Sequence, residues 1–230
     1  MRYLMWDIDG TLILTGGAGY DALVKVIKEY YHLDAFEFTK TLAGRTDSEI
    51  IKGVIMRLRG RPNIAEAASL MIRYHMALPA EMPGHPGRIL KNVEAALKYF
   101  ARPASRYENC ILSGNTRTGS KIKLEYFGLY KYFNFNHSAF GEISECRDDI
   151  AKIAWQRFYL NDPAVSKNDL IIIGDTPNDA RCAQAIGVRA LIVLFGSRYK
   201  REDFVDVVPW KILDALPDDP AELEAMLDER

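Results

Sequence analysis

Two aspartates one residue apart, Asp7 and Asp9, follow a short apolar run near the start of the chain. The run covers residues 3–6 (YLMW), and Gly10 follows directly after the pair. Side chains alternate along a strand, so both carboxylates would face the same way at its end. Two anions this close repel each other unless a proton or a cation lies nearby. A hard divalent ion with oxygen ligands meets this need, and Mg²⁺ is the expected ion.

The second apolar run, residues 109–113 (NCILS), ends in Ser113, and it is followed by Gly114, Asn115 and Thr116. A hydroxyl and backbone N–H groups in a turn at a helix start can hold a phosphate group. Serine also caps helices routinely, so this stretch alone has an ordinary structural explanation.

The third apolar run, residues 170–174 (LIIIG), is followed by Asp175, and Asp179 would lie about one turn into the next helix. Open parallel sheets bind ligands at the carboxyl ends of their strands. Three separate strands would therefore bring two aspartates, a serine and two further aspartates to one edge. Polar residues at the ends of all three strands favour one shared site over three unrelated turns.

The spacing of the apolar runs predicts an α/β fold with a doubly wound, Rossmann-like parallel sheet. A fourth run covers residues 190–195 (ALIVLF), and a weaker fifth at 206–209 (DVVP) is expected at a sheet edge, where proline is tolerated. Strands that alternate with helices are typical of parallel sheets. The expected helices lie near residues 87–101, 117–127, 148–160 and 177–186, with a short last helix in DDPAELEAMLDE.

Residues 16–84 break this alternation and predict a separate helical domain. Gly/Pro-rich connectors border the region on both sides, as is typical of domain boundaries. We expect an all-helical cap at 16–84, inserted into an α/β core of residues 1–15 and 85–230. The cap shows three amphipathic helical patterns, near 18–31, 47–59 and 64–77.

Taken in order, the stretches DIDGTL, LSGNT and GDTPND resemble three of the four motifs of the haloacid dehalogenase (HAD) superfamily. The resemblance covers essentially the whole chain. The helical insertion after the first motif is similar to the C1-type cap of the branch that contains phosphoglycolate phosphatase and β-phosphoglucomutase. This resemblance implies a Mg²⁺-dependent phosphatase that hydrolyses a small phosphomonoester metabolite through an aspartyl-phosphate intermediate.

The same resemblance implies a role for each matching residue. Asp7 corresponds to the nucleophile that attacks phosphorus, and Asp9 to the general acid/base that serves first the leaving alcohol and then water. Ser113, Gly114 and Asn115 would bind the phosphoryl group. The implied Mg²⁺ ligands are Asp7, the backbone carbonyl of Asp9, Asp175 and, directly or through water, Asp179.

The third motif of the family usually holds a lysine, and this sequence departs from the pattern. The candidates in FGEISECRDDIAKIAW are Arg147, at the start of a predicted helix, and Lys152, more than a turn further on. Arginine can donate two parallel hydrogen bonds to a phosphate. We expect Arg147 to supply the cation, and Lys152 remains the alternative, although a solvated surface position explains it equally well.

Arg45 lies on the predicted cap, in the stretch LAGRTDSEI just before a helix. We expect its guanidinium to contact an anionic or hydroxylated substrate, because family members use this cap loop for substrate contact. An exposed arginine beside a helix cap is the alternative.

The sequence favours a phosphatase over two other activities of the superfamily. A dehalogenase is disfavoured because that branch lacks the aspartate found here at Asp9. A phosphonatase would need a cap lysine, and none of Lys25, Lys28 and Lys40 has a recognisable context for that role. Two alternatives stay open: a phosphomutase similar to β-phosphoglucomutase, and a non-catalytic binding protein on the same fold.

The composition limits the kinds of partner and the cellular location that we expect for this protein. Thirty Lys and Arg against 31 Asp and Glu leave a net charge of −1, which gives no electrostatic case for nucleic acid or an anionic membrane. No apolar run approaches the roughly 18 residues of a membrane span. The three cysteines lack the spacing of a disulfide framework or a zinc site. We expect a cytoplasmic monomer or homodimer whose partner is a small-molecule phosphate ester.

Overall fold

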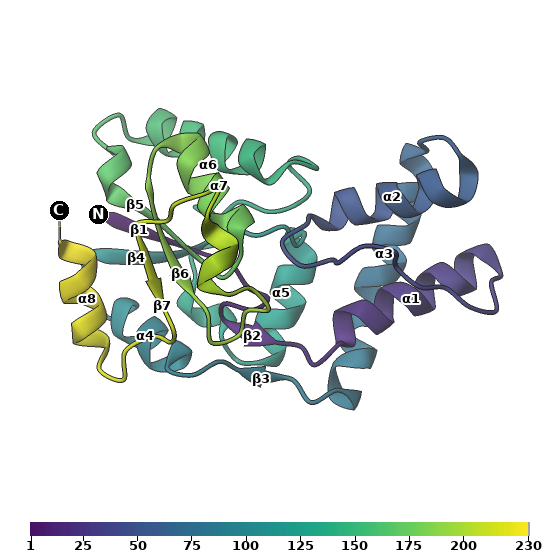
Figure 1. Cartoon of the computed structure of the whole chain (residues 1–230), viewed down its shortest axis with the longest axis horizontal. Coiled ribbons are helices and arrows are strands. Elements are labelled where there is room, and N and C mark those ends of the chain that lie inside the picture. The colour runs from purple at the N-terminus through teal and green to yellow at the C-terminus, as the bar shows by residue number, and fades with distance from the viewer. Residues whose placement is uncertain (230) are drawn as a thin grey trace.

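A five-stranded parallel sheet forms the centre of the larger part of the molecule (Figure 1). The computed structural model describes residues 1–229. The α/β sheet expected from the sequence is confirmed, because each of the four stronger apolar runs forms a strand buried between helices. Its strands, in spatial order, are β4 (Tyr107–Ile111), β1 (Arg2–Trp6), β5 (Leu170–Gly174), β6 (Arg189–Val193) and β7 (Lys211–Leu213).

Helices cover both faces of this sheet (Figure 1). Alternate residues of β1 face opposite ways: Leu4 and Trp6 belong to one apolar cluster, and Tyr3 and Met5 belong to the other. On the side of Leu4 lie α4 (Val93–Phe100), α5 (Arg117–Tyr126) and α8 (Pro220–Asp228), and on the other side lie α6 (Arg147–Asn161) and α7 (Pro177–Ile186).

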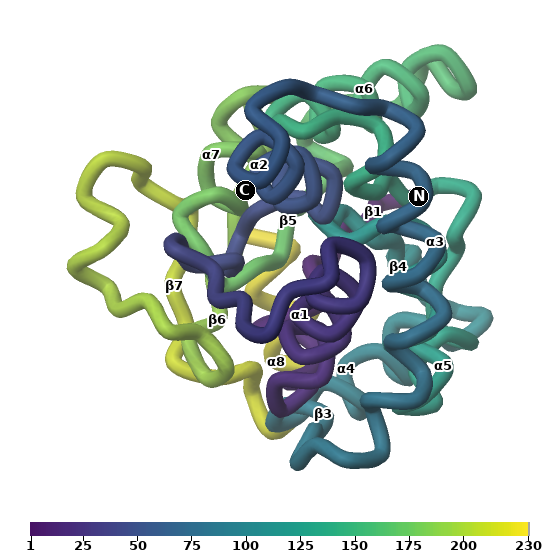
Figure 2. The backbone as a smooth tube through the Cα atoms, turned by 90° about the vertical axis from the view of Figure 1, so that its right-hand side faces the viewer, coloured from purple at the N-terminus to yellow at the C-terminus, as the bar shows by residue number. Residues whose placement is uncertain are grey.

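Three helices form a separate bundle beyond the carboxyl ends of the strands (Figures 1 and 2). They are α1 (Ala18–Tyr31), α2 (Asp47–Arg59) and α3 (Ile64–Glu81), and they enclose an apolar cluster of their own. Two helix starts are capped locally: Thr46 accepts the N–H of Glu49, and Asn63 accepts the N–H of Glu66. This bundle corresponds to the region expected to form a helical cap.

A short antiparallel pair joins the bundle to the sheet. Its strands, β2 (Ile13–Leu14) and β3 (Arg88–Ile89), flank the two places where the chain passes between the bundle and the rest. Four short 3₁₀ helices complete the described structure: Met82–Gly84, Tyr130–Tyr132, Lys167–Asp169 and Arg201–Phe204. Within residues 1–229, no helix combines the length and apolar character that crossing a membrane requires.

Two elements, β7 and α4, begin several residues later than the sequence predicts. The edge strand expected at 206–209 is wrong, because these residues lie in turns and irregular structure and β7 begins at Lys211. Pro209 has no N–H to donate to β6, so strand pairing begins only beyond it. The helix expected at 87–101 begins at Val93, since its first residues pair as β3 and Asn92 adopts a left-handed conformation with φ 64°.

Candidate active site

Three buried carboxylates meet at the carboxyl end of the sheet. Asp7 follows β1 directly, and its N–H donates to the carbonyl of Ile173 at 2.8 Å. Asp175 follows β5, and Asp179 lies in the first turn of α7. The three side chains offer oxygens within 4.8 Å of one another, and each residue is at most 4% exposed. The structure therefore brings together three aspartates that the sequence predicts at one strand edge.

The charges of this cluster do not balance. Burial raises the pKa of Asp7 to about 7, although Arg147 acts in the opposite direction. Burial and the neighbouring charges of Asp179 and Asp7 also hold the pKa of Asp175 well above its usual range. One guanidinium cannot neutralise three carboxylates, and a divalent cation would complete the balance. An all-oxygen donor set fits a hard ion such as Mg²⁺, which these aspartates could hold.

Arg147 lies inside this cluster. The first turn of α6 places it at 8% exposure, with one guanidinium nitrogen 3.3 Å from Oδ1 of Asp7 and 2.5 Å from Oδ1 of Asp179. Lys152 lies further along the same helix, exposed and paired with Asp149. Of the two candidate cations, the structure thus brings only Arg147 to the carboxylates.

Asp9 lies at the edge of the cluster, directly before a tight turn. Gly10 makes this turn with φ +90°, and a Cβ there would lie 2.5 Å from Oδ2 of Asp175, so the position excludes larger residues. Oδ2 of Asp9 accepts a hydrogen bond from Nδ2 of Asn115 at 2.8 Å, and the same nitrogen lies 3.0 Å from Oγ of Ser113. The turn after β4 therefore contacts the predicted acid/base, Asp9. The sequence predicted that the ends of these strands would meet at one edge of the sheet.

Lys123 is a site residue that sequence reasoning missed. It lies on α5 and is 4% exposed, and its Nζ donates to Oδ2 of Asp9 at 2.6 Å and to Oδ1 of Asn115 at 2.7 Å. Burial by itself would lower the pKa of this lysine, but the charge of Asp9 raises it above its ordinary value. A sequence signal existed, because Lys123 lies seven residues after Thr116, the cap of α5, on the same helix face.

Asp47, at the start of cap helix α2, is a second buried group that the sequence analysis did not single out. Its N–H donates to the carbonyl of Gly114, and its Oδ2 accepts the N–H of Thr116, each at 2.8 Å. Burial raises the pKa of Asp47 to about 6, against the nearby charge of Lys123. The cap loop is thus hydrogen-bonded to the turn that follows β4.

Arg45 lies on the same loop, but its side chain turns elsewhere. Its Nε donates to Oε1 of Glu49 at 2.9 Å, one turn further along α2. Its backbone carbonyl approaches the core closely, since a Cβ on Gly114 would lie 2.3 Å from that oxygen. In this arrangement the guanidinium pairs within the cap and does not contact the carboxylate cluster, so its predicted role in substrate binding stays a prediction.

The family model described as haloacid dehalogenase-like hydrolase matches residues 4–193. This match includes the sheet from β1 to β6, the helical bundle and every residue of the site described above. The chain therefore belongs to the haloacid dehalogenase-like hydrolases, and it is an enzyme of that class. No curated protein matches the sequence significantly.

Solved structures of similar fold include predicted phosphatases and a complex with phosphate. CbbY from Rhodobacter sphaeroides, in complex with phosphate, has a TM-score of 0.74 and 18% identity, and the similarity covers 100% of both chains. A predicted phosphatase from Clostridium acetobutylicum has a TM-score of 0.70 and 19% identity over 99% of each chain. A predicted phosphoglycolate phosphatase from Haemophilus somnus has a TM-score of 0.69 and 15% identity, covering 98% of this chain and 97% of that one. At these identities the likeness establishes the shared fold.

Proposed function

We propose that this hydrolase is a Mg²⁺-dependent phosphatase that acts on a small phosphomonoester through an aspartyl-phosphate on Asp7. The observation that carries the proposal is the buried cluster of Asp7, Asp175 and Asp179 with Arg147 bound to two of its members. When bound there, Mg²⁺ would screen the carboxylates and polarise the phosphoryl oxygens.

Asp7 acts as the nucleophile in this proposal. A carboxylate oxygen of Asp7 attacks phosphorus, the ester P–O bond breaks, and the electron pair leaves with the alcohol oxygen. Arg147, 3.3 Å from Oδ1 of Asp7, holds the carboxylate and stabilises charge on the phosphoryl group. In this proposal the turn formed by Ser113, Gly114 and Asn115 binds the remaining phosphoryl oxygens.

Asp9 carries the protons. Its carboxylic acid protonates the leaving alcohol, and the resulting carboxylate then accepts a proton from the water that attacks the aspartyl-phosphate. Inorganic phosphate leaves, and Asp7 is regenerated. Lys123 and Asn115 both hold Oδ2 of Asp9, so they act as positioning residues that direct the other carboxyl oxygen toward the leaving group.

The cap selects a small substrate. Asp47, Arg45 and the start of α2 lie directly over the turn that follows β4, so a bound ester would be enclosed between cap and core. Enclosure excludes bulk water during the attack on phosphorus, and opening of the cap admits the substrate. A small phosphorylated metabolite fits such a site better than a phosphoprotein does.

A phosphomutase is the second candidate, because it would use the same nucleophile and acid/base. The experiment that separates the two incubates the protein with Mg²⁺ and a panel of small phosphomonoesters, including sugar phosphates and phosphoglycolate. Free phosphate and positional isomers of each ester are both measured. We expect stoichiometric phosphate release with one preferred ester. An isomer formed without phosphate release would support the mutase instead, and neither product from any ester would contradict both proposals.

A further inference from the structure

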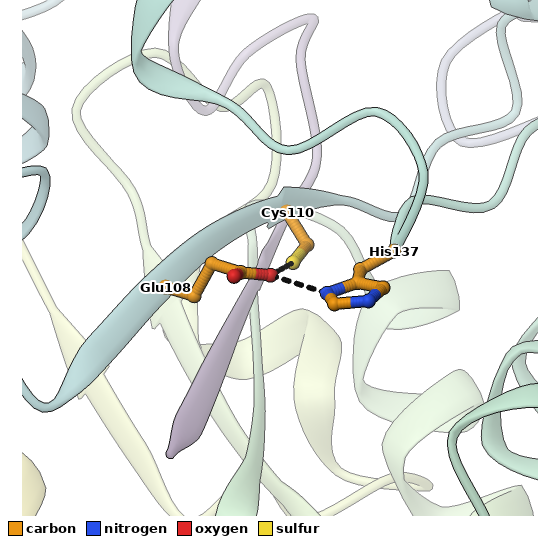
Figure 3. Close-up of side chains that lie close together, drawn as sticks. All are labelled: Glu108, Cys110 and His137. Atoms are coloured by element: carbon orange, nitrogen blue, oxygen red, sulfur yellow. Dashed lines mark hydrogen bonds and ion pairs between the residues drawn. The ribbon is translucent and has the colours of Figure 1, made fainter. Parts of the chain in front are cut away.

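A second group of metal-ligating side chains lies on the edge strand β4. Glu108, Cys110 and His137 bring a carboxylate oxygen, a thiol sulfur and an imidazole nitrogen within 4.8 Å of one another (Figure 3). Glu108 and Cys110 share one face of the sheet because they are two residues apart on the strand. The group has no residue in common with the candidate active site, and the proposed phosphatase chemistry does not use it.

The backbone fixes the third member of this group beside the other two. His137 belongs to the segment 134–139, which follows the outer edge of β4. The N–H of Asn134 donates to the carbonyl of Asn109 at 2.9 Å, and the N–H of Ala139 donates to the carbonyl of Ile111 at 2.8 Å. These hydrogen bonds hold the imidazole near the strand before any ion binds.

Oε1 of Glu108 is the centre of the group. It lies 2.6 Å from Nδ1 of His137 and 3.4 Å from Sγ of Cys110, and it also accepts from Nδ2 of Asn134 at 3.2 Å. Around a tetrahedral zinc ion with bonds of about 2.0–2.3 Å, neighbouring ligand atoms are roughly 3.3–3.8 Å apart. The sulfur–oxygen distance already matches, and the nitrogen–oxygen distance needs to widen by only about 0.7 Å.

Exposure and charge also suit a cation. The side chains of Glu108 and His137 are 27% and 35% exposed, so an ion and a water ligand can enter from solvent, whereas Cys110 is fully buried. Burial, followed by the charge of Glu108, holds the pKa of the Cys110 thiol well above its ordinary value. Without an ion this sulfur therefore stays protonated, and a thiolate beside the carboxylate would require a positive charge.

We propose that Glu108, Cys110 and His137 form a binding site for a zinc-class divalent ion, with water as the fourth ligand. Sulfur and nitrogen donors favour such borderline ions, whereas the all-oxygen cluster around Asp7 favours Mg²⁺. On binding, the S–H bond of Cys110 breaks, a sulfur–metal bond forms, and the proton leaves to solvent. The bound ion ties the segment 134–139 to the edge of β4.

Cobalt provides a direct test, because a thiolate bound to Co²⁺ gives a near-ultraviolet charge-transfer absorption and oxygen ligands do not. The full-length protein is treated with EDTA, transferred into excess Mg²⁺ and titrated with Co²⁺ alone. We expect the absorption to saturate at one Co²⁺ per chain and to disappear when Zn²⁺ is added. Absence of the absorption from the wild-type protein would overturn the proposal, whatever the outcome for phosphatase activity.

Cysteine variants identify the ligand. Cys110→Ser should abolish the absorption, whereas Cys146→Ser, which changes an exposed cysteine outside the group, should retain it. Absorption that survives in Cys110→Ser would place the ion on another cysteine and overturn the assignment. If Cys110→Ser does not fold, as judged by circular dichroism, His137→Ala decides the question. That variant alters a partly exposed ring and should weaken Co²⁺ binding more than about tenfold, and unchanged affinity would refute the site.

Discussion

At the scale of single residues, two buried cations hold the carboxylates of the candidate site. Arg147 contacts both Asp7 and Asp179, and we propose that it takes the role of the lysine usual in the family's third motif. A second cation, Lys123, is bound to Asp9 and is almost fully buried. Each of the two proposed reacting carboxylates therefore has its own cation, supplied by a different helix.

Replacing Lys123 tests whether it positions the acid. We expect Lys123→Met to lower kcat for an alkyl phosphomonoester at least about tenfold more than for p-nitrophenyl phosphate, because only the alkoxide leaving group needs protonation by Asp9. Lys121→Met is the matched control, since Lys121 lies on the same helix and pairs with Glu125 at the surface. Equal losses of kcat for the two esters would show that Lys123 has only a structural role.

Site residues that directly follow an apolar run could be predicted from the sequence. Several site residues that lie elsewhere could not. Asp7 and Asp175 follow buried strands, so strand topology alone places them together. The spacing from Thr116 gives the helix face of Lys123, but the contact of Lys123 with Asp9 depends on how α5 docks against the sheet, which this spacing does not encode. The candidate zinc ligands were missed for a similar reason: Glu108 and Cys110 lack CxxC spacing, and His137 joins them only because its segment follows the strand edge.

At the scale of elements, the contact between cap and core depends on small residues. Gly114 lies under the loop that precedes α2, and a Cβ there would lie 2.3 Å from the carbonyl oxygen of Arg45 and 3.1 Å from Cα of Thr46. The backbone of Gly114 does not require a glycine, since its φ is not positive. A side chain at this position would therefore interfere with the docking of the cap and leave the fold of the core unchanged.

Gly114→Ala should consequently impair turnover more than stability. We expect kcat/KM to fall roughly 10- to 100-fold, because a small displacement of the cap loop misplaces the enclosed ester. The midpoint of thermal unfolding should stay close to that of the wild type. Gly84→Ala is the control, because a Cβ at that position meets nothing within 4 Å. A Gly114→Ala enzyme with wild-type kcat/KM would show that this contact is not part of the active arrangement.

Element boundaries could be predicted where local residues, such as a helix cap, proline or glycine, begin or end the element. The helix expected at 177–186 is confirmed as α7, which begins at Pro177 after the cap Thr176 and ends before Gly187. The edge strand was expected at 206–209 instead of Lys211–Leu213, and β3 was not predicted, since short strands bury too little apolar surface to leave a clear pattern. Their places depend on pairing with neighbours that are distant in the sequence.

At the scale of the whole molecule, the carboxylate cluster links folding to metal binding. Three buried aspartates destabilise the folded chain through mutual repulsion, and a divalent ion bound only by the folded state would relieve it. The cluster joins β1, β5 and α7, so its stabilisation acts on the centre of the sheet.

Magnesium should therefore raise the unfolding temperature. At a concentration of about 100 times Kd, Mg²⁺ binding contributes roughly 2.7 kcal/mol, or about 5–10 °C for a chain of this size. Differential scanning calorimetry with Mg²⁺ and with EDTA measures the increment. Asp175→Asn should reduce it sharply, whereas Asp149→Asn, at an exposed position of α6, should retain it. An increment that is equal in all three proteins would contradict magnesium binding at this cluster.

The most direct test of the central claim is the initial rate of phosphate release from p-nitrophenyl phosphate by the wild type and by Asp7→Asn, each with Mg²⁺ and with EDTA. We predict turnover only for the wild type with Mg²⁺, and a loss of at least about 10³-fold in Asp7→Asn, because the amide cannot form the aspartyl-phosphate. Full activity of Asp7→Asn, or equal rates with Mg²⁺ and with EDTA, would contradict the proposed mechanism.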